Sequence, residues 1–166
     1  MSFEERKKME DEYIQYWLEE NPDWKQNPVG PLPDLTKPDG TYQDIKFINC
    51  TKYRIEHGYD LVAQKKGITG SEIDDWKENN IIDKCEYKFI CYDKKIYLID
   101  CKRFLDNVFK EINEREPTDE YSGTAFYICR LKDFIWEKID REIFNEKIYD
   151  VYICKNCKNS IVYSWM

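Results

Sequence analysis

No stretch of the 166-residue chain approaches the roughly 20 consecutive apolar residues that a membrane-spanning helix requires. The N-terminal segment MSFEERKKMEDEYIQYWLEE also lacks the apolar region of a secretory signal peptide. We therefore expect a soluble protein that stays in the cytoplasm. Because P-loop, GxGxxG and GxSxG motifs are missing too, the sequence supports neither a nucleotide-dependent enzyme nor a serine hydrolase.

The seven cysteines are an odd number, and several lie inside apolar runs such as KFICYD and FYICRL. In an intracellular protein these patterns favour reduced thiols that pack as small apolar residues. The motif CKNC at 154–157 resembles half of a zinc ribbon, but the chain has no second CxxC and no HxxxH. Zinc at Cys154 and Cys157 would therefore need ligands that the fold brings from elsewhere, such as Cys85, Cys129 or His57.

The charge balance is acidic, with a formal net charge of −7 and a pI near 4.9. Proteins that bind nucleic acid usually present a basic face, so any such face must occupy a minority of this surface. Aromatic residues make up 16% of the chain, which excludes a disordered protein. The composition indicates a folded domain whose acidic surface would also suit a basic protein partner.

Apolar periodicity predicts a single α/β (α+β) domain over 1–166, with a mixed central β-sheet flanked by helices. It comprises an N-terminal helix in 1–20, a core in 33–116 and a strand–helix–strand extension in 117–166. We expect helices at 3–20, 71–80, 102–116 and 132–144. We expect strands at 41–49, within 52–64, in a hairpin of 85–93 and 95–100, and at 124–131, 147–154 and 160–165.

The segment 33–48, PDLTKPDGTYQDIKFI, combines carboxylates with a lysine in a pattern suited to phosphodiester hydrolysis. Pro38-Asp39-Gly40 predicts a turn between two short strands. Alternation in the second strand places Asp44 and Lys46 on one face and the intervening apolar residues on the other. Two converging carboxylates suffice to hold Mg²⁺, which keeps several waters, and a nearby lysine can orient the attacking water.

At these residues the sequence resembles the PD-(D/E)XK nuclease superfamily, with Pro33-Asp34 matching the PD and Asp44-Ile45-Lys46 matching the acidic-x-Lys element. The tripeptide occurs seven times in the chain, but only Asp44 also has a Pro-Asp across a plausible turn. The resemblance implies a restriction-endonuclease-like fold, Mg²⁺ or Mn²⁺ held by Asp34 and Asp44, and Lys46 at the water. Glu56 is a candidate additional metal ligand, and Glu10 or Glu12 of the first helix could also reach the site.

A second arrangement resembles the Mrr-like members of the superfamily. Here Asp60 and Asp100 would bind the metal and Lys102 would assist. The alternative for the latter two is that a strand runs into a helix, with Asp100 as its N-cap and Lys102 in solvent. The lone His57 is a candidate acid–base or metal-binding residue, although a polar turn residue is the simpler interpretation.

Two classes of function follow from these patterns. The first is a small phage- or viral-type endonuclease acting on DNA, which would be a homodimer if it cuts both strands as many relatives do. Its phosphate-facing patch would consist of Lys37, Lys46, Lys52, Arg54, Lys65 and Lys66. The second is a non-catalytic acidic interaction protein, such as a phage-type inhibitor, a DNA mimic or a degenerate nuclease fold.

Overall fold

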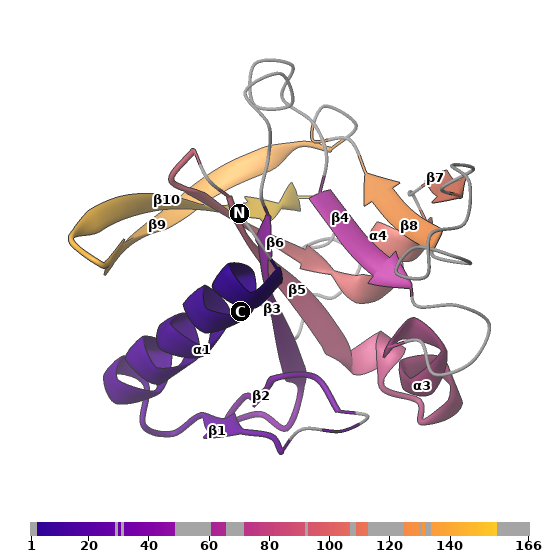
Figure 1. Cartoon of the computed structure of the whole chain (residues 1–166), viewed down its shortest axis with the longest axis horizontal. Coiled ribbons are helices and arrows are strands. Elements are labelled where there is room, and N and C mark those ends of the chain that lie inside the picture. The colour runs from indigo at the N-terminus through magenta and orange to yellow at the C-terminus, as the bar shows by residue number, and fades with distance from the viewer. Residues whose placement is uncertain are drawn as a thin grey trace.

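The computed structural model has a mixed seven-stranded β-sheet at its centre, in the order β1-β2-β3-β5-β6-β10-β9 (Figure 1). The pairs β3–β5 and β6–β10 are parallel and the other pairs are antiparallel. A separate three-stranded antiparallel sheet has the order β4-β8-β7. The predicted α/β class with a mixed sheet is thus confirmed. The structure describes residues 3–28, 30, 32–48, 61–65, 72–91, 93–106, 109–112, 125–129, 131 and 134–155.

The helical elements are α1 (Phe3–Glu20), α3 (Glu72–Glu78), the 3₁₀ turn η1 (Ile82–Lys84) and α4 (Cys101–Asp106). None of the helices in the described ranges is both long and apolar enough to span a lipid bilayer. The strands of the large sheet are β1 (Lys25–Gln26), β2 (Leu35–Thr36), β3 (Tyr42–Ile48), β5 (Cys85–Cys91), β6 (Lys95–Asp100), β9 (Trp136–Phe144) and β10 (Lys147–Cys154). Those of the small sheet are β4 (Leu61–Lys65), β7 (Phe109–Ile112) and β8 (Ala125–Cys129).

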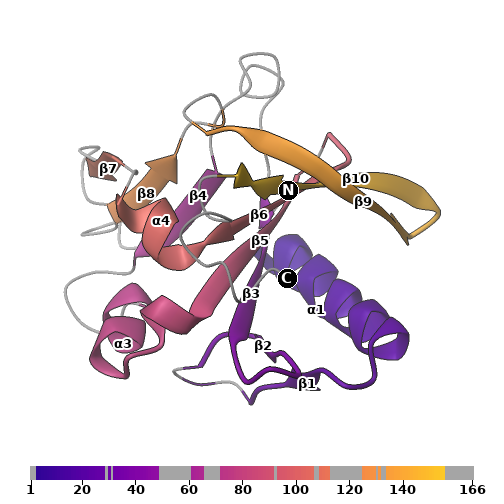
Figure 2. The same ribbon diagram turned by 180° about the vertical axis from the view of Figure 1, so that it is seen from behind.

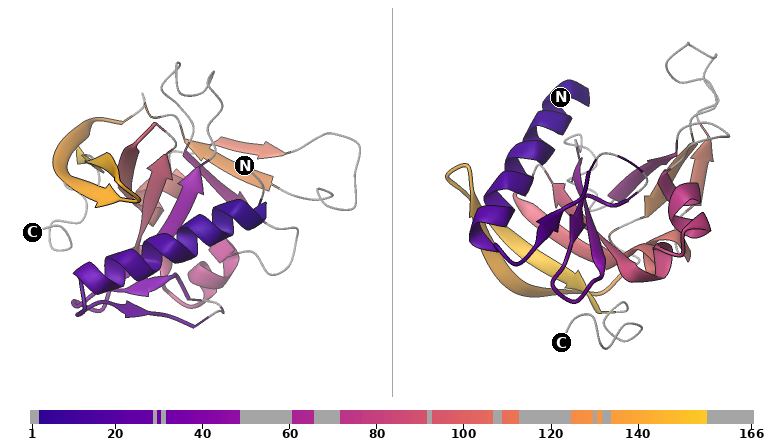
Figure 3. Two further views of the ribbon diagram at one scale, coloured as in Figure 1. Left: turned by 60° about the vertical axis from the view of Figure 1, so that its left-hand side comes forward. Right: turned by 90° about the horizontal axis from the view of Figure 1, so that it is seen from below.

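The N-terminal helix α1 lies across one face of the large sheet (Figure 3). Its Tyr13 and Ile14 are buried in a cluster with Ile45 and Phe47 of β3. The helix ends as predicted at Asn21, whose side-chain amide and backbone N–H both bond to the carbonyl of Trp17. Packing by this apolar stripe, rather than helix propensity alone, fixes α1 against β3.

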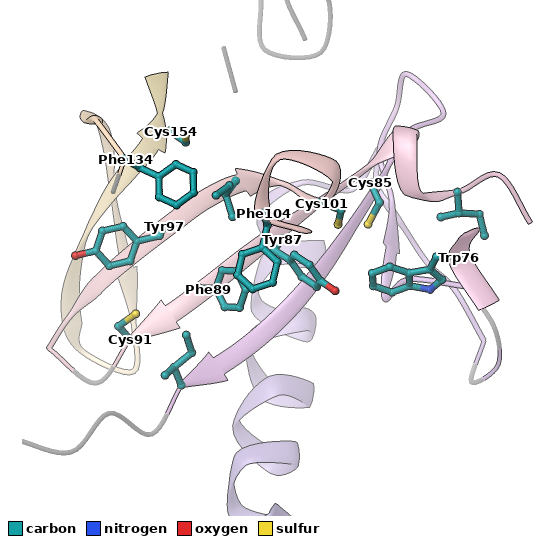
Figure 4. Close-up of a cluster of buried hydrophobic side chains, with 13 residues drawn as sticks. Trp76, Cys85, Tyr87, Phe89, Cys91, Tyr97, Cys101, Phe104, Phe134 and Cys154 are labelled. Atoms are coloured by element: carbon teal, nitrogen blue, oxygen red, sulfur yellow. The ribbon is translucent and has the colours of Figure 1, made fainter. Parts of the chain in front are cut away.

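An aromatic cluster covers the opposite face of the sheet, with α1 behind it (Figure 4). Tyr87 and Phe89 alternate along β5 and contact Phe104 of α4, with ring centroids 5.3 and 5.4 Å from it. Trp76 of α3 packs on Tyr87 at 5.7 Å. Since each fully buried aromatic ring stabilises the fold by roughly 2–3 kcal/mol, this cluster anchors the central strands.

One predicted helix is wrong, and another is longer in the prediction than in the structure. The segment 132–144 contains β9 instead, which pairs antiparallel with β10 and closes on a two-residue turn at Asn145 and Glu146, both with positive φ. Such left-handed turns match the twist of a hairpin, and long-range pairing overrode the helix-like spacing of the isoleucines. The resulting β9–β10 hairpin reaches beyond the body of the molecule (Figure 2).

The helix predicted over 102–116 is also shorter than expected. α4 ends at Asp106, and Phe109 and Ile112, which fall inside the predicted helix, belong instead to β7 and pair with β8. A strand partner more than ten residues away decides this assignment. The extension 117–166 likewise supplies β10, which lies next to β6 inside the large sheet.

Candidate functional site

The candidate site lies at the edge of β3. β2 has two residues and pairs with β3 only at Leu35–Gln43 and Thr36–Tyr42. The predicted turn at 38–40 is confirmed, with the Lys37 N–H bonding to the Thr41 carbonyl at 2.8 Å. Beyond Gln43, none of the described strands pairs with this side of β3. Backbone N–H groups there need acceptors from elsewhere.

Carboxylates supply those acceptors. The Ile45 N–H donates to Asp34 Oδ2 at 2.9 Å, and the Phe47 N–H donates to Glu10 Oε1 at 3.2 Å. The two donors are two residues apart and therefore point to the same side of the strand. Asp34 and Glu10 thus extend the hydrogen-bond ladder that β2 leaves incomplete, and this holds both acidic groups beside Asp44 and Lys46.

Asp44 interacts with both Asp34 and Lys46. Its Oδ1 accepts a hydrogen bond from the Asp34 N–H at 3.2 Å, and its Oδ2 lies 3.2 Å from Lys46 Nζ. The structure therefore brings Asp34, Asp44 and Lys46 together. Of the two helix candidates, Glu10 reaches this group, whereas Glu12 is exposed. Glu56 lies outside the described residues.

The environment of Asp34 strongly disfavours the ionised form of its carboxyl group. Burial, together with the neighbouring Asp44 carboxylate, raises the pKa of Asp34 to about 9, although its bond from the Ile45 N–H acts in the other direction. Burial also raises the pKa of Glu10 against the opposing effects of Lys46 and the Phe47 N–H. Adjacent, partly buried acids of this kind favour a positive charge between them, either a proton or a cation.

The donor set suits a hard divalent cation. It consists of carboxylate oxygens, which Mg²⁺ prefers, and Asp44 Oδ2 is a buried oxygen whose described partner is the Lys46 ammonium at 3.2 Å. Within the described ranges, no group of three or more His, Cys, Asp and Glu side chains is gathered closely enough to hold a metal. A cation held by the Asp34–Asp44 pair would therefore have to keep several water ligands, because these residues do not form a closed protein cage.

The second arrangement from the sequence is not assembled by its described members. Asp100 Oδ2 accepts a hydrogen bond from the Arg103 N–H at 3.0 Å, which confirms it as the N-cap of α4. Lys102 is exposed, with its nearest described carboxylate being Asp83 at 3.8 Å. Asp60 and His57 lie outside the described residues. Burial, opposed by this cap and reinforced by Glu86, raises the pKa of Asp100 to about 6.

The expected phosphate-facing patch is reduced. Lys37 forms an ion pair with the buried Glu86, which also accepts a hydrogen bond from Gln43 at 2.7 Å. Because Lys37 is only 11% exposed and engaged in this pair, we assign it a structural role. Lys46 lies in the candidate site. For the other patch members, Lys52, Arg54, Lys65 and Lys66, the structure describes no side chain.

Four cysteines are buried and form no disulfide: Cys85, Cys91, Cys101 and Cys154. The expectation of reduced, packed thiols is confirmed for these four. Burial raises the pKa of the Cys101 thiol well above its usual range, which makes it inert as a nucleophile. Cys157, the other half of the CxxC motif proposed for zinc, lies outside the described residues.

A buried ion pair that the sequence did not reveal connects α1 to the central strand β5 and to the edge strand β9. Lys88 of β5 is 1% exposed and lies 2.9 Å from Glu142 of β9. Glu142 also accepts a hydrogen bond from the Tyr13 hydroxyl, and the Lys88 ammonium lies 3.7 Å from the Trp17 ring centroid. The sequence gives no sign of this pair, because the pattern of 132–144 predicts a helix where β9 lies.

Arg6 is a further residue that the sequence did not single out. It stands four residues before Glu10 on α1, and hence on the same helical face. The only available signal was this spacing, which becomes informative once Glu10 is placed.

The chain matches no protein-family model, no curated protein and no solved structure.

Proposed function

We propose that this chain is a metal-dependent phosphodiester hydrolase that cuts DNA, an endonuclease with the restriction-endonuclease-like core of the PD-(D/E)XK superfamily. The observation that carries the proposal is the convergence of Asp34, Asp44 and Lys46 at the open edge of β3, with Glu10 beside them. Substrate class and fold family rest on the resemblance in 33–48, and the chemistry rests on this geometry.

Each residue has a separate role in this proposal. Asp34 and Asp44 would hold Mg²⁺ or Mn²⁺, which when bound stabilises the charge that develops on the phosphate oxygens. Lys46, ion-paired with Asp44 at 3.2 Å, orients the attacking water and offsets developing negative charge. Glu10 keeps α1 attached to the β3 edge through the Phe47 N–H and adds a carboxylate to the site.

The decisive experiment measures cleavage of plasmid and branched DNA with Mg²⁺ or Mn²⁺ by the wild type and by Lys46→Ala. We expect the variant to lose about 100-fold or more in rate, the typical effect of removing one preorganised electrostatic group. Lys95→Ala is the matched control. Lys95 belongs to another acidic-x-Lys motif, with Nζ 3.9 Å from Asp93, but it lies away from the β3 edge. Equal rates for wild type and Lys46→Ala would end the assignment of Lys46.

The second candidate is the non-catalytic acidic interaction protein. The observation favouring it is that Asp34 and Glu10 already serve as acceptors for backbone N–H groups, a structural role that needs no metal. The net charge of −7 fits a basic partner. Absence of cleavage by the wild type on every DNA form, with no binding of Mg²⁺ or Mn²⁺ by calorimetry, would favour this function over the hydrolase.

A further inference from the structure

Arg6 is directed toward the candidate site by its position on α1. It lies one helical turn before Glu10, whose carboxylate is fixed on the Phe47 N–H of β3. The guanidinium is near enough to Glu10 to oppose the rise in its pKa. Arg6 is half-buried, whereas the adjacent Lys7 and Lys8 are exposed. Of the three successive cations, only Arg6 therefore faces the β3 edge.

The Arg6 guanidinium has a hydrogen-bonding capacity that the protein does not use. Its Nε is buried without a hydrogen-bond partner, and no carboxylate in the described part of the chain lies within 4.0 Å of it. An arginine is always charged, and its planar donors match the oxygens of a phosphate in pairs. An anion that enters the site from solvent would supply the missing acceptors.

A DNA substrate needs such a cation here. The chain carries a net charge of −7, Lys37 is engaged with Glu86, and Lys46 is ion-paired with Asp44. We propose that Arg6 binds the non-bridging oxygens of a DNA phosphate adjacent to the one that is cut, and so positions the strand over Asp34 and Asp44. This inference rests on the proposed endonuclease function. It makes Arg6 a substrate-positioning residue.

The test compares Arg6→Gln with Lys7→Gln, which removes the same charge from the exposed side of the same turn. Binding of a fluorescent DNA duplex is measured without divalent cation over a range of salt concentrations, and kcat/KM for cleavage is measured with Mg²⁺. Loss of a charge-assisted phosphate contact should weaken Arg6→Gln by about 10-fold to 100-fold in both assays. Its salt slope should also fall by about one, whereas Lys7→Gln should change either quantity less than about 3-fold.

Arg6→Lys guards against a folding defect, because it keeps the charge and the aliphatic stem but loses the paired donors. The kcat/KM of Arg6→Lys should fall between the values of the wild type and Arg6→Gln, mainly through a higher KM. If Arg6→Gln and Lys7→Gln lose DNA affinity and kcat/KM to the same extent, Arg6 contributes only net charge and the inference is wrong. If the wild type cuts DNA and folded Arg6→Gln cuts it equally well, the inference alone fails. If the wild type neither binds nor cuts DNA, the proposed function fails with it.

Discussion

Replacing Asp34 with Asn should stabilise the protein at neutral and alkaline pH in the absence of divalent cations. Asn is nearly isosteric and retains an oxygen that can accept the hydrogen bond from the Ile45 N–H, now 2.9 Å from Asp34 Oδ2. What it removes is an acid whose pKa is raised from 3.8 to about 9 by burial and by Asp44. The variant therefore measures the cost of burying this acid beside a second carboxyl group.

The raised pKa of Asp34 determines whether the free energy of unfolding increases or decreases with pH. Below pH 3.8 Asp34 is protonated in both the folded and the unfolded protein, so it does not penalise folding. As the pH rises toward 9, the unfolded chain loses this proton while the folded protein retains it, and the free energy of unfolding decreases. A rise of the Asp34 pKa from 3.8 to about 9 would correspond to about 7 kcal/mol at most. Because Asp34 is only partly buried, solvent screening reduces this, and we expect about 2 kcal/mol.

Thermal unfolding of the metal-free proteins at pH 4 and pH 8 measures this difference. At pH 8 the melting temperature of Asp34→Asn should exceed that of the wild type by about 4–8 °C, and at pH 4 the two should nearly agree. Saturating Mg²⁺ should raise the wild-type value more than that of the variant. Asp39→Asn is the control, because hydrogen bonds from Thr41 outweigh its slight burial and lower the pKa of Asp39. Destabilisation by Asp34→Asn at pH 8 would refute the reasoning.

Two further substitutions test the scaffold by urea unfolding. Lys88→Ala leaves Glu142 buried without its cation, so it should cost about 3–5 kcal/mol, and Lys88→Met combined with Glu142→Leu should recover much of that loss. Gly40→Ala should cost about 1–2 kcal/mol through backbone strain alone, because φ is +87° and nothing lies within 4 Å of the added Cβ. A smaller loss for Lys88→Ala than for Gly40→Ala would contradict the importance of the buried pair.

The elements that the sequence predicted correctly are those whose signals are local. Alternation over 41–48, the turn at 38–40 and the apolar stripe of α1 each depend on neighbouring residues, and each agrees with the structure. The approach of Asp34 to Asp44 follows from the same turn. The errors at β7 and β9 arise where a distant strand decides the conformation. Isoleucines at 135, 139 and 143 have helical spacing, but pairing with β10 makes this segment a strand.

The environment of the candidate site was less predictable than its residues. Sequence spacing could place Asp44 and Lys46 on one face, but it could not show that β2 stops after two residues and leaves the β3 edge open. That short pairing is why Glu10 and Asp34 come to lie at β3. Nor could composition show that Lys37 is engaged with a buried glutamate, since partners far apart in sequence meet only in the folded chain.

The carboxylates along β3 also affect how the molecule behaves in a crowded solution. An uncovered strand edge displays a row of amide donors that an extended segment of another molecule can join, which is a common start of aggregation. Asp34 and Glu10 occupy two successive positions of that row with negatively polarised oxygens and so discourage such an addition. Replacing both with Ala would expose the edge of β3 to pairing with other molecules and would also remove two carboxylates of the acidic site. Protection of this strand edge and the proposed metal site therefore depend on the same two side chains.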